Sequence, residues 1–264
     1  MKTMPANLLN TGGWDSTFRL LQLLLIEKRP VQPIYILDPE RWSLPQELQA
    51  MAKIKNAVLA RFPEAEEYLL PTIMYDRTDV KPDPELADHA EKLVKKIHFG
   101  GQYEWLARAT KQFGIENAEI CIENDFGQPV GCYATVHTLL EEGQDGMRRV
   151  AEREGHEHEF AVFGMFTFPI VTLTKVDMKE IAQQHDFLDI LEMSWFCHRP
   201  NFLGEACGTC NPCRIAMSHG MAHRVPPLGR FCYRVATILD IRPLVRKWPA
   251  LFNLLKRIKG GRAS

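Results

Sequence analysis

Apolar positions along the chain fall into short continuous runs and longer segments with one apolar side. Short runs bounded by turn residues are typical of buried strands, and they predict strands at residues 7–10, 31–37, 67–71 and 118–123, with a further candidate at 160–163. Helical spacing predicts helices at residues 17–27, 45–62, 84–113 and 175–185, the third being interrupted by Gly100 and Gly101. Strands therefore alternate with helices, which predicts an α/β fold with a doubly wound, mostly parallel sheet covered by helices on both faces.

Two local signals indicate where ligands would lie on such a sheet. Thr174 and Asp177 have the spacing of a capping box, which predicts the start of the helix at 175–185. Glu123 and Asp125 fall at the carboxyl end of the fourth predicted strand, the edge at which open sheets bind ligands. We therefore regard both carboxylates as candidates for contact with Mg²⁺ or with an acceptor substrate.

The composition is that of an ordinary globular protein. Of the 264 residues 45% are apolar and 25% are charged, which excludes collagen-like, disordered and coiled-coil classes. The longest apolar stretch near the start, residues 20–26, is shorter than the roughly 20 residues that span a bilayer. The first ten residues lack the features of a signal peptide, so we expect a cytoplasmic protein.

Charge is distributed unevenly along the chain. Residues 229–264 carry nine Lys or Arg against one acid, Asp240, a net charge of +8 that leaves −9 on the rest. Within this segment residues 249–259 predict a basic amphipathic helix. We rank its possible ligands as a partner protein or a second copy in a homodimer, then RNA, and last an anionic membrane. Basic residues are also favourable at a helix C-terminus without any partner.

A glycine turn lies between the first predicted strand and the first helix, in the sequence TGGWDST at residues 11–17. Gly12 and Gly13 allow positive φ and close backbone approach, so successive N–H groups and the helix dipole could hold a phosphate. The motif is neither a P-loop ending in Gly-Lys-Ser/Thr nor a dinucleotide fingerprint. The simpler alternative is a turn in which Asp15 and Ser16 only cap the helix.

No lysine lies in this turn, so another group would have to compensate the negative charge of a bound phosphate. Mg²⁺ is one such group. Lys175, the first residue of the helix after the predicted capping box, is our first candidate side chain. A lysine in a first helical turn is more often a solvated surface residue. Asp177 is better explained as the helix-start acid.

Four of the seven cysteines are close together in the sequence, as C-x9-C-x2-C-x2-C. Cys197, Cys207, Cys210 and Cys213 could hold Zn²⁺ tetrahedrally, and such a closed shell makes the metal structural. An iron–sulfur cluster is the alternative, and we favour zinc. In a chain without a signal peptide, clustered cysteines indicate metal binding and not disulfides.

The combination of these motifs resembles one family. The turn is similar to the Ser-Gly-Gly-x-Asp-Ser loop of the ATP pyrophosphatases, also called the PP-loop or adenine nucleotide alpha hydrolase superfamily. Residues 160–217 look like the 7-cyano-7-deazaguanine synthase branch, and the resemblance covers roughly residues 7–220. The matching pieces are Thr174-Lys175-Val176-Asp177, Ser194-Trp195-Phe196-Cys197, Cys207 to Cys213 and Arg214, with a weaker match from Gly101 to Asn124.

The resemblance implies a Rossmann-like PP-loop domain at residues 1–190, a zinc element at 191–225 and a helical tail at 226–264. It also implies an ATP-dependent ligase that adenylates a carboxylate, 7-carboxy-7-deazaguanine in queuosine biosynthesis or a related acid, and then transfers it to ammonia or another amine. Asp15, Ser16 and Lys175 would be catalytic. The residues that would bind ATP are Thr11, Gly12, Gly13, Trp14, Asp15, Ser16, Thr17 and Gly101.

The sequence departs from the family where the substrate base would be recognised. Residues 38–42 replace a Tyr-Gly-Gln-rich element, and residues 126–132 only partly match the family's substrate element. Two alternatives therefore remain open. One is a PP-loop enzyme acting on another acceptor, such as a protein terminus or tRNA in a bacterial defence or modification pathway; the other is a non-catalytic protein that binds a nucleotide or a partner.

Overall fold

A computed structural model describes residues 4–126, 128–218 and 220–238. The chain divides into two compact units, Met1–Trp195 and Phe196–Ser264, and each is described by itself. The predicted helix at residues 249–259 lies outside the described residues. No helix in the described ranges is long and apolar enough to cross a membrane.

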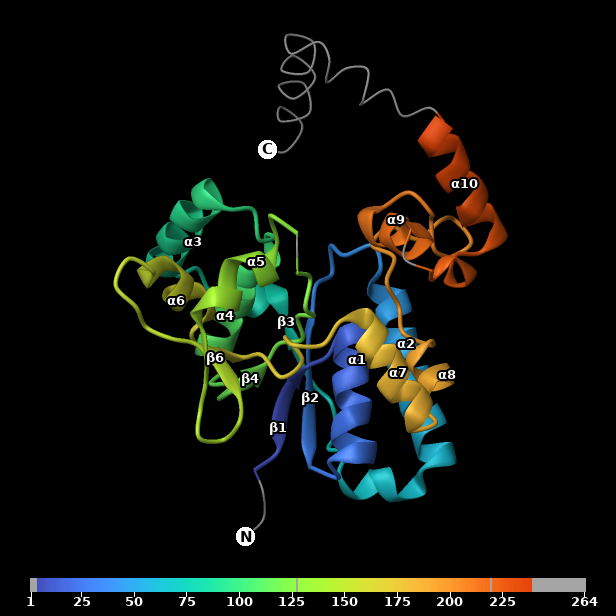
Figure 1. Cartoon of the computed structure of the whole chain (residues 1–264), viewed down its shortest axis with the longest axis horizontal. Coiled ribbons are helices and arrows are strands. Elements are labelled where there is room, and N and C mark those ends of the chain that lie inside the picture. Colours follow the sequence, from blue (N-terminus) through green and yellow to red (C-terminus); the bar gives the residue numbers. More distant parts are fainter. Residues whose placement is uncertain (1–3, 127, 219, 239–264) are drawn as a thin grey trace. The chain divides into compact units, whose positions relative to one another are not determined.

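The first unit is built on a parallel sheet of five strands in the order β3-β2-β1-β4-β7 (Figure 1). Every neighbouring pair is parallel, as the alternation of strands and helices predicts. The α/β prediction is therefore confirmed. The strands are β1 (Ala6–Leu9), β2 (Val31–Leu37), β3 (Ile73–Asp76), β4 (Ala118–Glu119) and β7 (Phe166–Thr167).

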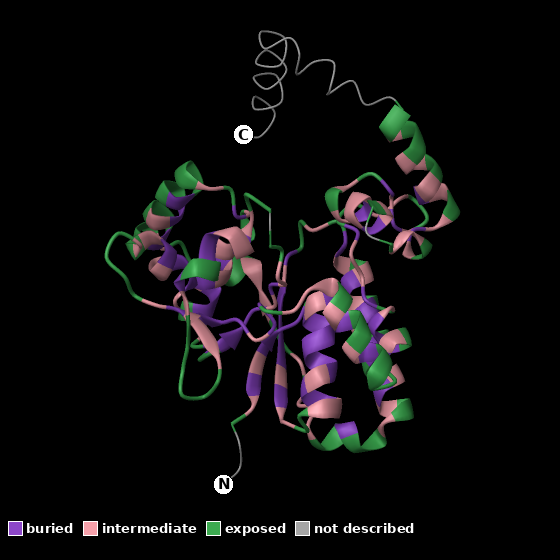
Figure 2. Cartoon of the chain, viewed as in Figure 1, coloured by how far each residue is buried: buried purple, intermediate pink, exposed green. Residues whose placement is uncertain are grey.

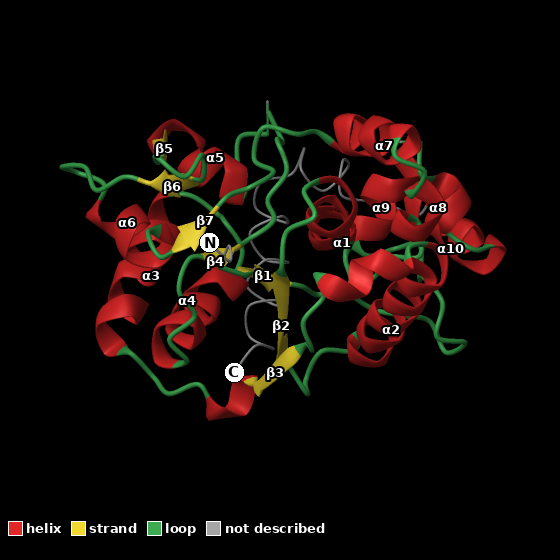
Figure 3. Ribbon diagram, turned by 90° about the horizontal axis from the view of Figure 1, so that it is seen from below, coloured by secondary structure: helices red, strands yellow, loops and turns green. Residues whose placement is uncertain are grey.

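Helices cover both faces of this sheet (Figure 3). One face carries α1 (Trp14–Leu21), which continues as a π-helix over Gln22–Ile26, and α2 (Leu44–Arg61), α7 (Lys175–Gln184) and α8 (Leu188–Leu191). The other face carries α3 (Pro84–Lys96), α4 (Gln102–Gln112), α5 (Cys132–Val136) and α6 (Glu157–Phe163). A small antiparallel hairpin, β5 (Leu140–Glu142) and β6 (Arg148–Val150), lies outside the sheet. Short 3-10 helices span Pro63–Glu67, Arg77–Asp79 and His137–Leu139.

Each face of the sheet has its own apolar core, and buried positions follow the strands and the inner sides of the helices (Figure 2). On the α1 face Phe18, Ile54 and Met178 are fully buried. On the α3 face Leu93 and Phe163 are fully buried. Burial of side chains of this size stabilises the fold by about 1.5–3 kcal/mol each, so the sheet and its helices form one cooperative scaffold.

A buried ion pair crosses the α1 face. Arg19 of α1 donates to Glu119 of β4 at 2.7 Å, and the two side chains are 4% and 2% exposed. Glu27 is a second partner of Arg19. Because a buried charge without a partner is costly, this ion-pair network holds α1 against β4.

Two strand predictions were wrong. Residues 67–71 do not form the third strand; only an isolated bridge joins Leu69 to Val31, and the strand lies at Ile73–Asp76. Pro71 has no N–H to donate to a ladder, and it lies between the bridge at Leu69 and the strand that begins at Ile73. The run at 160–163 belongs to helix α6, and the strand follows at Phe166–Thr167. A short apolar run does not distinguish a strand from a buried helical turn.

Other local predictions were confirmed. The helical region at 84–113 is divided after Lys96, and Gly100 has a φ of +99°. The capping box is present: Thr174 Oγ1 accepts a hydrogen bond from the Asp177 N–H, and the Asp177 carboxylate accepts one from the Thr174 N–H. The start of α7, and with it Lys175, is thereby fixed.

The second unit contains α9 (Asn211–Ser218), a 3-10 helix at Ala222–Arg224 and α10 (Pro227–Ile238). Gly208 and Gly229 meet backbone to backbone, since a Cβ on Gly208 would lie 1.8 Å from the Gly229 carbonyl oxygen. Both positions need glycine. This contact joins α10 to the loop that carries the cysteines.

Candidate functional site

The strand order places a topological switch point between β1 and β4. The chain runs from β1 outward through β2 to β3 and then crosses to β4 on the other side of β1. In open α/β sheets, ligands bind at the carboxyl edge beside such a point. The glycine turn follows β1 and Glu123 follows β4, so both sequence-predicted groups belong to this edge.

The glycine turn is shaped by its contacts with α2 and with Asn10. Gly12 has a φ of +67°, and a Cβ there would lie 3.0 Å from Met51 Cγ and 3.1 Å from the Glu47 carbonyl oxygen. The Gly12 N–H donates to the buried Asn10 side chain at 3.0 Å. Gly13 has an ordinary φ of −76°, so only the first glycine uses the expected positive φ. Glycine is required at position 12 by conformation and by the close approach of α2.

The start of α1 has no side-chain cap among the described residues. Gly13 is the N-cap, and Ser16 Oγ accepts from the Thr11 N–H and donates to the Gly13 carbonyl, each at 3.4 Å. The alternative in which Asp15 or Ser16 caps the helix is therefore not observed. First-turn N–H groups have no partner within a helix and lie at its positive end, so this helix start can accept an anion.

Lys175 joins the helix start to the end of β4. Its Nζ lies 2.9 Å from Asp15 Oδ1 and 2.8 Å from Glu123 Oε1. The three side chains come from α1, α7 and the segment after β4, and about a quarter of each is exposed. We call Asp15, Glu123 and Lys175 the switch-point triad. The structure thus brings together three residues that the sequence proposed on separate grounds.

The triad is electrostatically coupled. Burial, together with the negative charge of Asp15, raises the pKa of Glu123 to about 7, although Lys175 acts in the opposite direction. Burial alone would lower the pKa of Lys175, but the charges of Asp15 and Glu123 outweigh it and raise that pKa. The lysine is therefore an ammonium at neutral pH, while Glu123 can gain or lose a proton there.

Other predicted ATP-binding residues lie differently. Trp14 and Thr17 are buried in the α1 face, and the Thr17 N–H donates to the Gly13 carbonyl, so their side chains contribute to packing. Gly101 is the N-cap of α4. Thr11 is exposed beside the turn. Asp125 is also exposed. Burial and the charge of Asp15 raise the pKa of Glu123, and the charge of Asp125 adds a smaller effect in the same direction.

Two residues near the triad were missed by sequence reasoning. Tyr103 is half-buried and shares a hydrogen bond with Cys132; burial, then Cys132, and also the charge of Asp15 raise its pKa. Asn10, which holds the Gly12 N–H, is the other. The position of Asn10 at the end of a predicted strand was a usable signal, whereas nothing in the sequence connects Tyr103 to residue 15.

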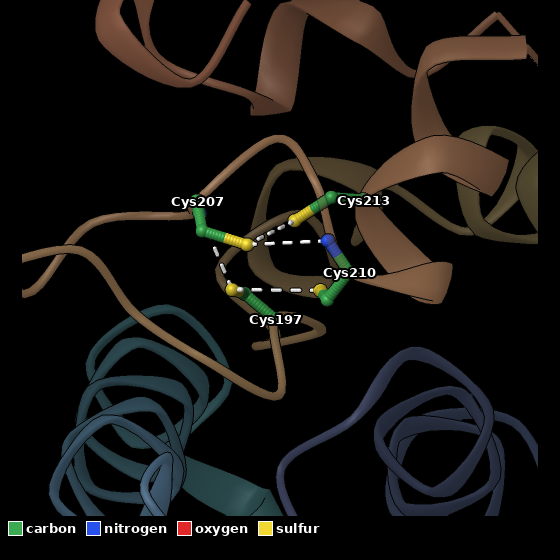
Figure 4. Close-up of side chains that lie close together, drawn as sticks. All are labelled: Cys197, Cys207, Cys210 and Cys213. Carbon is green, nitrogen blue, oxygen red and sulfur yellow. Dashed lines mark hydrogen bonds between the residues drawn. The ribbon is translucent and has the colours of Figure 1, made fainter. Parts of the chain in front are cut away.

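The four predicted metal ligands meet in the second unit (Figure 4). Their sulfur atoms all lie within 4.8 Å of one another, with 3.8 Å between Cys197 and Cys210 and 3.9 Å between Cys207 and Cys213. Tetrahedral zinc with Zn–S bonds of about 2.3 Å has sulfur–sulfur edges of about 3.8 Å. The cluster can therefore hold a metal such as zinc.

Backbone N–H groups also point at these sulfur atoms. The Cys207 N–H donates to Cys197 Sγ at 3.3 Å, and the Cys210 and Thr209 N–H groups donate to Cys207 Sγ at 3.3 and 3.4 Å. Donors of this kind stabilise thiolates, which are the metal-binding form. The knuckle, residues 207–213, is thus arranged for thiolate ligation.

Comparisons with known proteins found no matching family model, no similar curated protein and no similar solved structure.

Proposed function

We propose that the chain is an ATP-dependent ligase of the PP-loop type. It activates a carboxylate by adenylation with release of pyrophosphate, and then transfers the acyl group to ammonia or another amine. The observation that carries this proposal is the meeting of Asp15, Glu123 and Lys175 at the switch point, beside an α1 start without a side-chain cap.

The difficulty of the reaction is the leaving group, because a carboxylate oxygen is not displaced by an amine. The substrate carboxylate attacks the α-phosphorus of ATP and pyrophosphate leaves. The amine then attacks the acyl carbon of the mixed anhydride, the amide forms and AMP leaves. The first-turn N–H groups of α1 suit the departing pyrophosphate. Lys175 Nζ suits the oxygens that gain charge in the same step.

The two carboxylates of the triad have separable roles. Asp15 presents an oxygen ligand of the kind that Mg²⁺ prefers, and the ion would offset the charge of the triphosphate. Glu123, with a pKa of about 7, can accept the proton that the attacking amine must lose. The ion pair with Lys175 orients both groups before a substrate arrives.

The cysteine cluster has a structural role in this proposal. Four thiolates would complete the shell of a zinc ion and leave no position for substrate. Cys197 and Cys213 are fully buried, which agrees with a site that organises the chain around it. Zinc would supply folding energy to the second unit.

The test is a radiochemical assay with the full chain. Incubation with α-labelled ATP, Mg²⁺, 7-carboxy-7-deazaguanine and ammonium should yield labelled AMP, pyrophosphate and the amide, or the nitrile if a second molecule of ATP activates the amide oxygen. AMP formed only with another carboxylate would keep the ligase and change its acceptor. We expect Asp15→Asn and Lys175→Met to reduce AMP formation at least about 100-fold.

Lys179→Met is the matched control, since Lys179 is an exposed lysine one turn further along α7. Equal activity of all three variants, or ATP binding without pyrophosphate release for any carboxylate tested, contradicts the proposal. The second result would favour the non-catalytic alternative.

A further inference from the structure

The second unit carries a net charge opposite in sign to that of the first unit. Residues 196–264 contain twelve Lys or Arg and two acids, Glu205 and Asp240, a net charge of +10. The first unit has 20 basic and 31 acidic residues, a net charge of −11. A strongly basic unit within an acidic chain favours a polyanionic partner.

Residues 196–238 of this unit contain five arginines and no lysine. They are Arg199, Arg214, Arg224, Arg230 and Arg234, and the one acid in this range is Glu205. Arginine presents a planar fork that binds phosphate through two hydrogen bonds, and its flat face stacks on rings. Arg224 already lies 4.9 Å above the Phe196 ring. Arginines of this kind suit phosphate groups as partners.

A polar hollow lies beside the cysteine cluster. Its volume is about 300 Å³, and its walls are His198, Arg199, Thr209, Cys210 and Asn211. These walls carry the hydrogen-bond donors of an arginine, a hydroxyl and an amide, and no acidic side chain. Arg199 is exposed at this hollow. Such a hollow suits a phosphate group with its attached sugar.

Two aromatic side chains of the second unit are strongly exposed. Phe202 is 89% exposed, and Phe231 on α10 is 63% exposed. Arg230 and Arg234 lie one turn apart on α10, next to Phe231. The Gly208–Gly229 contact joins this helix to the knuckle, which fixes its arginines relative to the hollow. Rings that stay exposed beside arginines can stack on unpaired bases.

We propose that the surface formed by residues 196–238 binds single-stranded RNA. Arg199 and the hollow hold one phosphate group, Arg230 and Arg234 hold others, and Phe202 and Phe231 stack on bases. The proposal is independent of the ligase function. A base-paired duplex would not expose the faces that these rings need.

The test measures fluorescence anisotropy of a labelled twelve-nucleotide oligouridylate with the zinc-loaded full chain at several salt concentrations. Each phosphate contact of a single strand contributes about −0.7 to the slope of log K against log salt. Arg199→Gln and Arg230→Gln should each weaken binding and reduce the magnitude of the slope by about 0.7. Phe231→Ala should weaken binding about tenfold with an unchanged slope.

Arg61→Gln, which removes the same charge from the first unit, is the control and should leave affinity unchanged. Zinc content and circular dichroism of each variant establish that the second unit is intact. Unchanged affinity in Arg199→Gln and Arg230→Gln overturns the proposal and assigns any binding to residues 239–264. Equal affinity for a duplex of the same length, or displacement of RNA by vesicles with 30% phosphatidylserine, also overturns it.

Discussion

Lys175 Nζ and Asp15 Oδ1 lie 2.9 Å apart although 160 positions separate the two residues in the chain. Asp15 is in the first turn of α1, and Lys175 is the first residue of α7. A third group, Glu123 after β4, completes the contact. The pair therefore joins the beginning of the first crossover to the connection that follows the last strand of the sheet.

The free energy of unfolding should depend on pH because Glu123 titrates at different pH values in the folded and unfolded protein. The folded protein keeps this carboxyl protonated up to about pH 7, whereas the unfolded chain releases the proton near its ordinary pKa of 4.5. The folded state binds more protons between these values, so this residue lowers the free energy of unfolding as pH rises through that window. The Glu123→Gln variant has no carboxyl group at this position, so its free energy of unfolding should not show this decrease.

Urea denaturation of both proteins at pH 5 and pH 8 measures the effect. The stability of the variant relative to the parent should increase between the two pH values by an amount on the order of 1 kcal/mol. A difference that stays constant with pH would show that Glu123 does not titrate in this window. In the adenylation assay, the rate of amine transfer should rise with an apparent pKa of about 7 in the parent protein only.

The buried pair of Arg19 and Glu119 should be costly to break from one side. Glu119→Gln leaves the Arg19 guanidinium without its main buried partner, and we expect a loss of about 3–5 kcal/mol in the free energy of unfolding. Replacing both residues, as Arg19→Met with Glu119→Leu, should recover much of that loss. The exposed pair of Lys95 and Glu91 on α3 provides the control, and its removal should not change stability measurably.

Two separate features require glycine at position 12: its positive φ and its close contact with α2. Gly12→Ala places a side chain at positive φ and brings its Cβ to 3.0 Å from Met51 Cγ. Gly114→Ala is a matched control, since Gly114 has a similar φ of +61° with no atom within 4 Å of a Cβ. Both variants should lose about 1–2 kcal/mol from strain, and Gly12→Ala should lose more because α2 must move. Equal thermal shifts would show that the contact with α2 is easily relieved.

The geometry of the cysteine cluster predicts that the purified protein contains bound zinc. Elemental analysis should find zinc in equal amount to the chain, and Cys210→Ser should lose the metal together with the fold of the second unit. Cys232→Ser is the control, because Cys232 lies outside the cluster. A brown, iron-containing protein would indicate an iron–sulfur cluster in place of zinc.

The sequence indicated the parallel sheet and the three members of the triad, although not their mutual contact, and it misplaced two strands. Asp15, Glu123 and Lys175 each lie just after a predicted strand or at a marked helix start, and parallel strands bring such positions to one edge. The third strand was misplaced because Leu69 and Leu70 form an apolar run before Pro71, while the true strand has the exposed residues Ile73 and Met74 at the sheet edge. The strand prediction at residues 160–163 was wrong for another reason. These residues are buried because α6 packs against α3.

The contact between Gly208 and Gly229 has a consequence for variation in this chain. With one backbone pressed against the other, neither position can gain even a methyl group unless α10 separates from the loop of cysteines. Substitution at either glycine should thus damage a metal shell to which neither contributes a ligand. Loss of bound metal in Gly229→Ala would be the sign of this dependence.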